Sequence, residues 1–366
     1  MARVSIKDVA EQAGVSTATV SHVINRTRFV REETRQKVLA AIEGLQYQPS
    51  AIARGLATNS TQTIGLIISD IANPFFTAVA RGVQDEIHQR GYHTIFCNTD
   101  EDPVREDEYL RLLSARQIDG LIIAPTGLHS ERLIRMAQAG LPIVLLDRDT
   151  PGLDAPLVGV DNEGGAYQAT QYLIELGHRQ IAILVGMATI STQVTRFNGY
   201  KRALREAGLP LNESLVIRAD SRSYSNQLAL LDAPPSGFRT NNQMTPTAYH
   251  VLQHVLDSPP LPTAIFITNN EMTVGALHAL RQRGLRCPQD ISLISFDDHD
   301  WAPIFVPPLT VVRQPTYELG QAAAILLLKM LNHEEIALPQ PLPVEFIIRE
   351  SCRQLQPEYP ILEPAS

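Results

Sequence analysis

The stretch IKDVAEQAGVSTATVSHVIN, residues 6–25, decides the fold of the N-terminal end of the chain. Ser5 stands three residues before Asp8, which is the pattern of a capping box that opens a first helix, and Gly14 ends that helix. Ser16 then stands where it can cap a second helix. Two short helices joined by a tight turn at a glycine predict a helix-turn-helix, whose second helix enters the major groove of DNA.

The spacing of apolar residues completes a three-helix head. In the second helix Val20, Val23 and Ile24 share the inward face. The opposite face carries small and polar residues: Thr17, Ala18, Ser21, His22 and Asn25. A third helix is expected over about Glu32 to Leu45, with four inward residues: Val38, Leu39, Ile42 and Leu45. A small helical bundle without a function is the alternative interpretation of this pattern.

Charge is distributed unevenly along the chain. The net charge of the 366 residues is −8, which by itself argues against a nucleic-acid partner. Residues 1–58, however, hold eight Lys and Arg against five Asp and Glu, a balance of +3 that leaves −11 for the rest. A basic head on an acidic body indicates a polyanion as the partner of the head and a different partner for the body.

The sequence predicts neither a secretory signal peptide nor a membrane-spanning helix. MARVSIKDVA contains no apolar core of a signal peptide, and no apolar run approaches the roughly 18 residues of a transmembrane helix. Cys97, Cys287 and Cys352 lie far apart and predict reduced thiols. We therefore expect a cytoplasmic protein with no membrane partner.

The sequence predicts no enzyme, metal or cofactor either. It lacks a Gly-rich phosphate loop and a nucleophile elbow. His299 stands between Asp298 and Asp300, but adjacent residues do not converge on one metal ion.

From Thr63 onward, apolar strands alternate with amphipathic helices. TIGLIISDI, HTIFCNTD, DGLIIAP, PIVLLDRD, QIAILVG, TAIFITNN and ISLISFDD are the clearest strands. Continuous apolar strands separated by helices predict parallel sheets covered on both faces. About a dozen strands are too many for one compact sheet, so the sequence predicts two similar α/β lobes. Ligands of such folds bind at the carboxyl ends of the strands, and the cleft between the lobes is the expected pocket.

Two polar segments fall outside this alternation. Residues 220–243 are polar, with four serines, two adjacent prolines and one glycine, and predict an exposed loop with a short amphipathic piece at NQLALL. Residues 351–366 contain three prolines and no heptad pattern, and we expect an unstructured tail there.

The order of these motifs resembles the lactose-repressor (LacI/GalR) family of bacterial transcription regulators. The head carries IKDVAEQAGVSTATVSHVIN and ETRQKVLAAIEGLQYQPSAIARGL. The body carries IGLIISDIANPFF, LDRD, HRQIAIL, RFNGYKRAL, TAIFITNNEMTVGAL, ISLISFDD and PPLTVVRQP. Within the family, TATVSHVINRTRFVREETR is most similar to purine-repressor-like members.

The resemblance implies a domain plan. Residues 1–48 would form the helix-turn-helix domain, 49–60 a hinge helix, and 351–366 the tail. Residues 61–350 would form a two-lobed effector-binding and dimerisation domain like a periplasmic binding protein. The N-lobe would comprise about 61–160 and 293–320, and the C-lobe about 161–292 and 321–350.

The resemblance also implies a homodimer on a palindromic operator, with one head in each half-site. Thr17, Ala18 and His22 fall where the family reads bases, and Thr19, Ser21 and Asn25 fall where it contacts phosphate or fixes the helix. Hydroxyls, small methyl groups and an imidazole suit these contacts. Arg26 and Arg28 would add salt-dependent attraction to phosphates.

The hinge PSAIARGLATN, residues 49–59, is too short to be a stable helix by itself. The resemblance implies that it folds against its dimer mate on DNA. Leu56 would then wedge into a base step of the minor groove, and Arg54 would reach phosphate. We expect Leu56→Ala to keep effector binding and to weaken operator binding.

The resemblance implies a small polar effector between the lobes, usually a sugar, a nucleobase or a related metabolite. Seven positions match the effector site: Phe75, Phe76, Arg148, Asp161, Arg196, Asn269 and Asp297. Trp301, the only tryptophan, follows FDDHD and is an eighth candidate that would cap the pocket; packing at a lobe or subunit interface is the alternative. Aromatic rings stack on sugar or base faces, and Arg, Asn and Asp bind hydroxyls. Two arginines suggest an anionic ligand such as a sugar acid.

Some positions depart from the family pattern. Arg31 replaces the usual small hydroxyl residue and removes an N-cap, Ser295 replaces a glycine, and NN replaces ND at Asn269 and Asn270. Induction and co-repression are both open, as are the effector and the operator. A solute-binding receptor without a DNA role is the alternative function, and the basic head argues against it.

Overall fold

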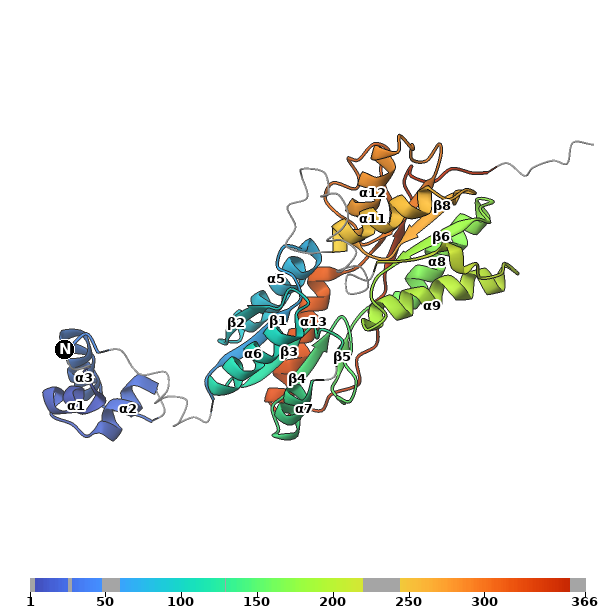
Figure 1. Ribbon diagram of the computed structural model, residues 1–366. Coiled ribbons are helices and arrows are strands. Elements are labelled where there is room, and N and C mark those ends of the chain that lie inside the picture. The colour runs from blue at the N-terminus through green and yellow to red at the C-terminus, as the bar shows by residue number, and fades with distance from the viewer. Residues whose placement is uncertain (1–3, 26–27, 48–59, 129, 220–243, 356–366) are drawn as a thin grey trace, which may run out of the picture. The chain divides into compact units, whose positions relative to one another are not determined.

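The computed structural model describes residues 4–25, 28–47, 60–128, 130–219 and 244–355, with the side chains of Asn25 and residues 244–246 left aside (Figure 1). The expected hinge helix, with Arg54 and Leu56, lies outside the described residues, as do Arg26, the expected loop at 220–243 and most of the expected tail. The chain divides into two compact units, Met1–Gln62 and Thr63–Ser366.

The first unit holds the three predicted helices, α1 (Ile6–Ala13), α2 (Thr17–Asn25) and α3 (Glu32–Gly44). The capping box is confirmed, because the Asp8 carboxylate accepts from the Ser5 N–H at 2.7 Å and from its hydroxyl at 2.8 Å. Gly14 adopts φ 66°, and Ser16 Oγ accepts from the Thr19 N–H at 3.2 Å. These contacts set the turn between α1 and α2.

The core of this unit lies where the three helices meet, at Val9, Ala10, Val20, Val23, Val38 and Ala41. The prediction for Leu39 was wrong, because 46% of this residue is exposed. The buried face of α3 is centred on Val38 and Ala41, and Leu39 lies about 100° around the helix from Val38.

The second unit contains two sheets. The first has the strand order β2-β1-β3-β4-β5 and is parallel throughout. Its strands are β1 (Thr63–Ile68), β2 (His93–Asn98), β3 (Gly120–Ile123), β4 (Ile143–Leu146) and β5 (Leu157–Val158). Its helices are α5 (Pro74–Gln89), α6 (Pro103–Ala115), α7 (Glu131–Gln138) and α13 (Thr316–Leu331).

The second sheet has the order β11-β10-β9-β8-β6-β7, with β11 as an antiparallel edge strand. Its strands are β6 (Ile181–Val185), β7 (Val216–Arg218), β8 (Ala264–Ile267), β9 (Ser292–Phe296), β10 (Thr310–Arg313) and β11 (Glu345–Ile347). Its helices are α8 (Asn162–Glu175), α9 (Ser191–Glu206), η1 (Glu213–Leu215), α11 (Met244–Leu256) and α12 (Asn270–Gln282). Figure 1 shows the two lobes that the sequence predicted.

The predicted boundaries of the lobes need correction. Strands β9 and β10, expected in the N-lobe at 293–320, pair with β8 in the C-lobe sheet. Helix α13, expected partly in the C-lobe, lies along α5 and packs on the N-lobe (Figure 1). The backbones of α5 and α13 meet at two glycines, since a Cβ at Gly82 or at Gly320 would lie 2.1 Å from the carbonyl of Tyr317 or of Val79.

Among the described residues, none of the helices combines the length and apolar character that crossing a membrane requires.

Candidate functional site

The exposed face of α2 is the candidate DNA surface. Thr17 and Ala18 are exposed, and Ser21 and His22 are half-buried. Thr19 shares a hydrogen bond with Ser16 at 2.9 Å, so its hydroxyl serves the start of the helix. Arg28 is exposed beyond the end of α2. The face therefore presents the small and polar groups that the sequence placed there.

The second candidate site is a cavity of about 70 Å³ between the two lobes of the core. Its lining comes from the carboxyl ends of strands in both sheets and from the first turns of the helices that follow. Six of the eight predicted residues line it: Phe75, Phe76, Arg148, Arg196, Asn269 and Asp297. A ligand of ordinary size needs about 300 Å³ or more, so the lobes lie close to closure.

Arg148 is a fixed element of the N-lobe wall. Its guanidinium donates to both carboxylate oxygens of Glu101, at 2.9 and 3.0 Å, and to Ser69 Oγ at 2.7 Å. It is 4% exposed, and burial by itself would lower its pKa, but the negative charges of Glu101, Asp147 and Glu106 together keep that pKa above the ordinary value. Sequence reasoning missed Glu101, which lies just after β2 and balances this buried charge.

Arg196 occupies the C-lobe wall. Its Nε donates to Asn162 Oδ1 at 2.7 Å, its Nη1 donates to the Thr268 carbonyl at 2.6 Å, and its guanidinium stacks 3.7 Å from the centre of the Phe296 ring. No described residue accepts a hydrogen bond from Nη2. Arg196 thus presents one oriented donor group to the cavity.

Two aspartates end strands in the left-handed region of backbone conformation. Asp147 has φ 65° after β4, and Asp297 has φ 80° after β9. This conformation is costly for residues other than glycine and is concentrated at functional sites. Gln314 donates from Nε2 to Asp297, which fixes that carboxylate at the cavity wall.

An amide pair joins the lobes at the cavity. Asn73 caps α5 in the N-lobe, accepting from the Phe75 N–H at 2.9 Å, and Asn270 begins α12 in the C-lobe. Asn270 Nδ2 donates to Asn73 Oδ1 at 2.7 Å, and Asn73 Nδ2 donates to Asn270 Oδ1 at 3.2 Å. We call this reciprocal contact the amide clasp.

Acidic groups outnumber basic groups around the cavity. Two arginines, Arg148 and Arg196, face five carboxyls: Asp70, Glu101, Asp147, Glu271 and Asp297. Burial raises the pKa of Asp147 above its ordinary value. The expectation of an anionic ligand rested on the two arginines alone, and the carboxyls oppose it.

Two predicted residues lie outside the cavity. Asp161 is exposed and caps α8, where its Oδ1 accepts from the Gly164 N–H at 2.8 Å. The next residue, Asn162, points inward to Arg196 instead. Trp301 packs against the C-lobe core and stacks on His299, with ring centroids 4.9 Å apart.

Gln193 is a further residue that the sequence did not indicate. It is 5% exposed, and its Oε1 accepts from the Gly186 N–H at 3.0 Å and from the Thr268 hydroxyl at 2.5 Å. It stands in the same helical turn as Arg196 and lines the cavity. Its position three residues before Arg196, on the same face of the helix, was the available signal.

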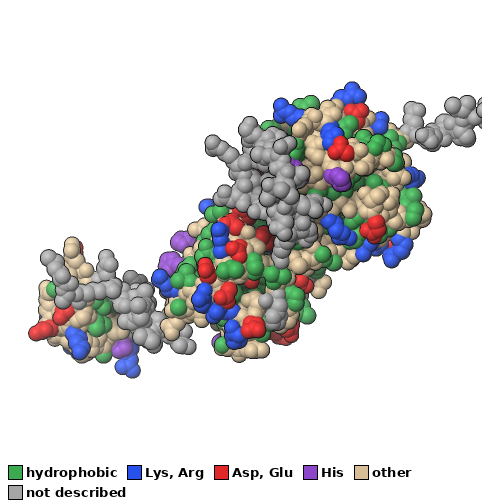
Figure 2. All heavy atoms as spheres, viewed as in Figure 1, with side chains coloured by type: hydrophobic (Ala, Val, Ile, Leu, Met, Phe, Trp, Pro, Cys, Tyr) green, Lys and Arg blue, Asp and Glu red, His purple; other side chains and the backbone are tan. Residues whose placement is uncertain are grey.

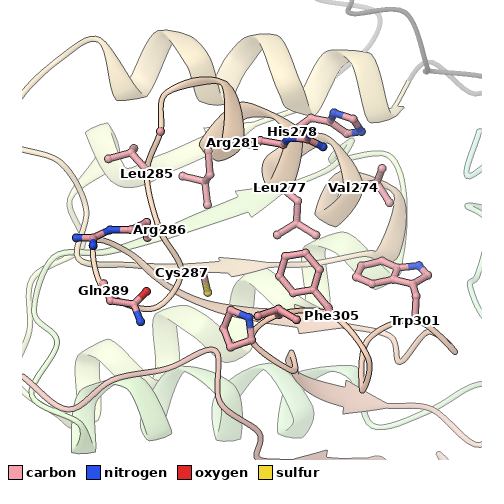
Figure 3. Close-up of a pocket in the computed structure, with 14 residues that line it drawn as sticks. Val274, Leu277, His278, Arg281, Leu285, Arg286, Cys287, Gln289, Trp301 and Phe305 are labelled. Carbon is pink, nitrogen blue, oxygen red and sulfur yellow. The ribbon is translucent and has the colours of Figure 1, made fainter.

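A separate apolar groove of about 860 Å³ lies on the C-lobe, which we call the α12 groove (Figure 3). Figure 3 shows Leu277 and Phe305 facing each other across it, with Trp301 at one end and Cys287 at its floor. Beside it, Ile304 and Val306 are 78% and 89% exposed. An exposed apolar surface of this kind is typical of a protein interface.

On the face of the core seen in Figure 2, acidic and basic side chains are interspersed. That face has no continuous basic field of the kind that binds DNA nonspecifically. The candidate for DNA contact is the small polar surface of α2, the second helix of the helix-turn-helix.

Comparison with known proteins assigns both the helical head and the two-lobed core to known domains. Residues 5–50 match the model of bacterial regulatory proteins of the lacI family. Residues 61–233 match the periplasmic binding proteins and sugar binding domain of the LacI family, and residues 170–352 match a periplasmic binding protein-like domain. Head and cleft together define a DNA-binding transcription regulator under the control of a small molecule. The chain belongs to the LacI family.

Individual relatives are similar over nearly the full length. The HTH-type transcriptional repressor PurR of Photobacterium profundum is 38% identical over 358 residues, covering 96% of this chain and 99% of the relative. PurR of Haemophilus influenzae is 35% identical over 356 residues, with the same coverage.

Solved structures show the same architecture. The lac repressor dimer bound to operator and the anti-inducer ONPF is 26% identical, with a TM-score of 0.78, covering 96% of this chain and all of the other. The CelR–cellobiose complex is 30% identical, with a TM-score of 0.65, covering 95% and 100%. The head excludes the alternative of a solute-binding receptor without a DNA role.

Proposed function

We propose that this protein represses transcription by binding a palindromic operator as a homodimer, and that a neutral polar metabolite in the interlobe cavity sets its operator affinity. It acts in the cytoplasm and has no catalytic activity. The observation that carries the effector assignment is the cavity itself, where an oriented arginine donor and an excess of carboxyls line a nearly closed space.

Each head places α2 in the major groove of one half-site. Thr17, Ala18 and His22 read bases, while Ser21, Asn25 and Arg28 contact the backbone. Arg26, Arg54 and Leu56 extend this surface through the hinge. Hydroxyl and methyl groups at exposed positions 17 and 18 suit close contact with bases and the thymine methyl.

The effector carries many hydrogen-bond donors. The carboxyls of Asp147 and Asp297 accept hydrogen bonds, and Arg196 Nη2 donates one. A sugar hydroxyl supplies both kinds of group, and a nucleobase presents both on one edge. A phosphate or sugar acid would instead meet the surrounding carboxyls.

A second copy of the chain covers the α12 groove. The groove is apolar, its rim exposes Ile304 and Val306, and the related lac repressor structure is a dimer. Burial of these side chains stabilises a dimer by removing apolar area from water.

Selection from a random DNA library followed by fluorescence anisotropy tests this function. We expect the full-length chain to enrich a palindrome and to bind it at least tenfold tighter than a scrambled duplex. His22→Ala should reduce this preference, whereas Arg202→Ala on the core should leave it unchanged. Failure to enrich any sequence would refute the proposal.

A further inference from the structure

The interlobe cavity continues outward into a second compartment. A groove of about 900 Å³ lies beside it, and four residues line both spaces: Phe75, Asn270, Asp297 and Gln314. We call the second space the outer groove. The two spaces therefore adjoin at these four residues.

Two buried polar atoms in the outer groove have no hydrogen-bond partner among the described residues. One is Gln314 Oε1, on a side chain that donates to Asp297 through Nε2 and belongs to a residue only 6% exposed. The other is His299 Nε2. Buried polar atoms without partners are destabilising, so such a pair points to a ligand that satisfies them.

The cations of the outer groove are already neutralised. Arg313 and Arg349 both donate to Asp298, at 2.7 and 2.8 Å, and Arg349 also donates to the Leu309 carbonyl at 2.7 Å. Asp297 and Asp300 add negative charge. The groove therefore disfavours phosphate or carboxylate groups.

The remaining wall is aromatic and hydroxylic. The rings of His299 and Trp301 stack at 4.9 Å with an interplanar angle of 19°, and Phe75 lies on the side of the inner cavity. Thr77 and Thr316 contribute hydroxyls. Burial lowers the pKa of His299 below its ordinary value, so the ring is neutral at pH 7 and can donate or accept one hydrogen bond at Nε2.

We propose that the outer groove is a specificity subsite for a second, hydroxylated sugar ring of the effector, held by Gln314 and His299. Hydroxyl groups satisfy both atoms because each hydroxyl donates and accepts. This inference rests on the proposed function of the inner cavity. The extended ligand is a two-ring molecule, either a disaccharide or a nucleoside whose ribose lies outside.

Calorimetry with matched probe pairs tests the subsite on the full-length dimer. The pairs are glucose and cellobiose, galactose and lactose, adenine and adenosine, and hypoxanthine and inosine. We expect a two-ring member to bind about tenfold tighter than its one-ring partner, the gain that satisfying a buried polar group provides. Trp301 is the only tryptophan of the chain, and its emission should change with the two-ring member alone.

Variants separate the subsite from the inner cavity. His299→Phe keeps a ring beside Trp301 but removes the polar atom, so the two-ring preference should fall to about twofold with one-ring affinity unchanged. His299→Gln keeps a hydrogen-bonding group and should lose less of the preference. His254→Phe, at an exposed position of α11, is the matched control and should keep the full two-ring preference.

Three results would overturn the subsite. In the first, no two-ring probe binds better than its partner. In the second, His299→Phe keeps the full preference. In the third, His299→Phe weakens self-association in sedimentation and leaves the two-ring preference intact. That result would show that the outer groove is part of the interface between subunits. A one-ring probe that binds and shifts operator affinity would uphold the proposed function while these results reject the subsite.

Discussion

Arg196 combines a structural role with a binding role. Two of its hydrogen bonds hold the start of α8 and the end of β8 together, and its third donor group faces the cavity. It is 3% exposed, and burial lowers its pKa below the ordinary value. The planar guanidinium makes this arrangement possible, because the donor directions of arginine are fixed relative to one another.

Arg196→Lys should separate these roles. A lysine keeps the charge but cannot bridge Asn162 and the Thr268 carbonyl while stacking on Phe296. We expect unfolding free energy to fall by about 1–3 kcal/mol and effector affinity to fall at least tenfold. Urea unfolding and calorimetry measure the two effects. Arg202→Lys on the same helix is the control, and equal losses in both variants would contradict this role.

His178 should give the core a pH-dependent stability. Its ring is fully buried, with Nδ1 2.9 Å from Thr263 Oγ1 and Nε2 3.1 Å from the Arg353 carbonyl. Burial lowers its pKa below the ordinary value of 6.5. The neutral ring therefore stabilises the fold above pH 6.5, and this contribution is lost as pH falls through the lower folded-state pKa.

Thermal unfolding from pH 7.5 to pH 5 measures this effect. The wild-type chain should lose stability toward acid more steeply than His178→Gln, so that the difference between them narrows. A difference that stays constant over this range would show that His178 does not titrate with unfolding.

Single positions at helix starts were the hardest to predict. Asp161 and Asn162 both follow β5, and successive helical residues point about 100° apart. The pattern could not show that Asp161 turns outward to cap α8 while Asn162 turns inward to Arg196. Trp301 lies outside the inner cavity, where its ring stacks on that of its neighbour His299, so its predicted contact with the effector stays a prediction.

At the scale of elements, helix starts were predicted well wherever a side chain caps them. Ser5 and Ser16 stand at such positions, and α1 and α2 begin there. Strand pairing was predicted less well. Strands β9 and β10 are as apolar as those of the first sheet, so their sequence does not specify which sheet they join. The strand pairing in the structure shows that both strands belong to the C-lobe sheet, because Phe266 of β8 pairs with Ile294 of β9, which in turn pairs with Thr310 of β10.

Helix α3 has an uncapped start that can be improved. Arg31 occupies the N-cap position and makes no side-chain capping hydrogen bond, as the sequence predicted. Arg31→Ser should stabilise α3 by about 1 kcal/mol, because the hydroxyl accepts from an unpaired helix N–H. Hydrogen exchange of α3 amides in the full-length chain measures the gain.

Arg31→Ala is the control for this prediction, because it removes the same charge without supplying a cap. Equal protection of α3 in both variants would attribute the effect to charge near the helix dipole. Weaker operator binding by both variants would show in addition that Arg31 contacts phosphate.

At the scale of the whole molecule, the closed cleft depends on few polar contacts between the lobes. The amide clasp joins the starts of α5 and α12, and Asn73 Nδ2 also lies 3.5 Å from Glu271 Oε1. A separate hydrogen bond runs from the Asp149 N–H to Ser191 Oγ at 3.1 Å. A closed form held by such contacts is separated from an open form by a few kcal/mol, a difference that a ligand can bias.

Asn270→Ala should therefore shift the core toward an open cleft. Both hydrogen bonds of the amide clasp are lost, each worth about 1 kcal/mol. We expect a larger radius of gyration in X-ray scattering without ligand and a several-fold weaker effector affinity, because ligand binding must then close the cleft. Asn198→Ala, on the exposed face of α9, is the control. An unchanged radius and affinity would show that the amide clasp does not hold the lobes.

Coupling between the cleft and the head is tested most directly by operator titrations with and without the effector. For the full-length chain on its selected palindrome, a saturating ligand of the interlobe cavity should change the Kd at least fivefold, in either direction. Arg196→Ala should abolish that change while the Kd without ligand stays within about twofold. A ligand that occupies the cavity and leaves the operator Kd unchanged would contradict control of DNA binding from this site.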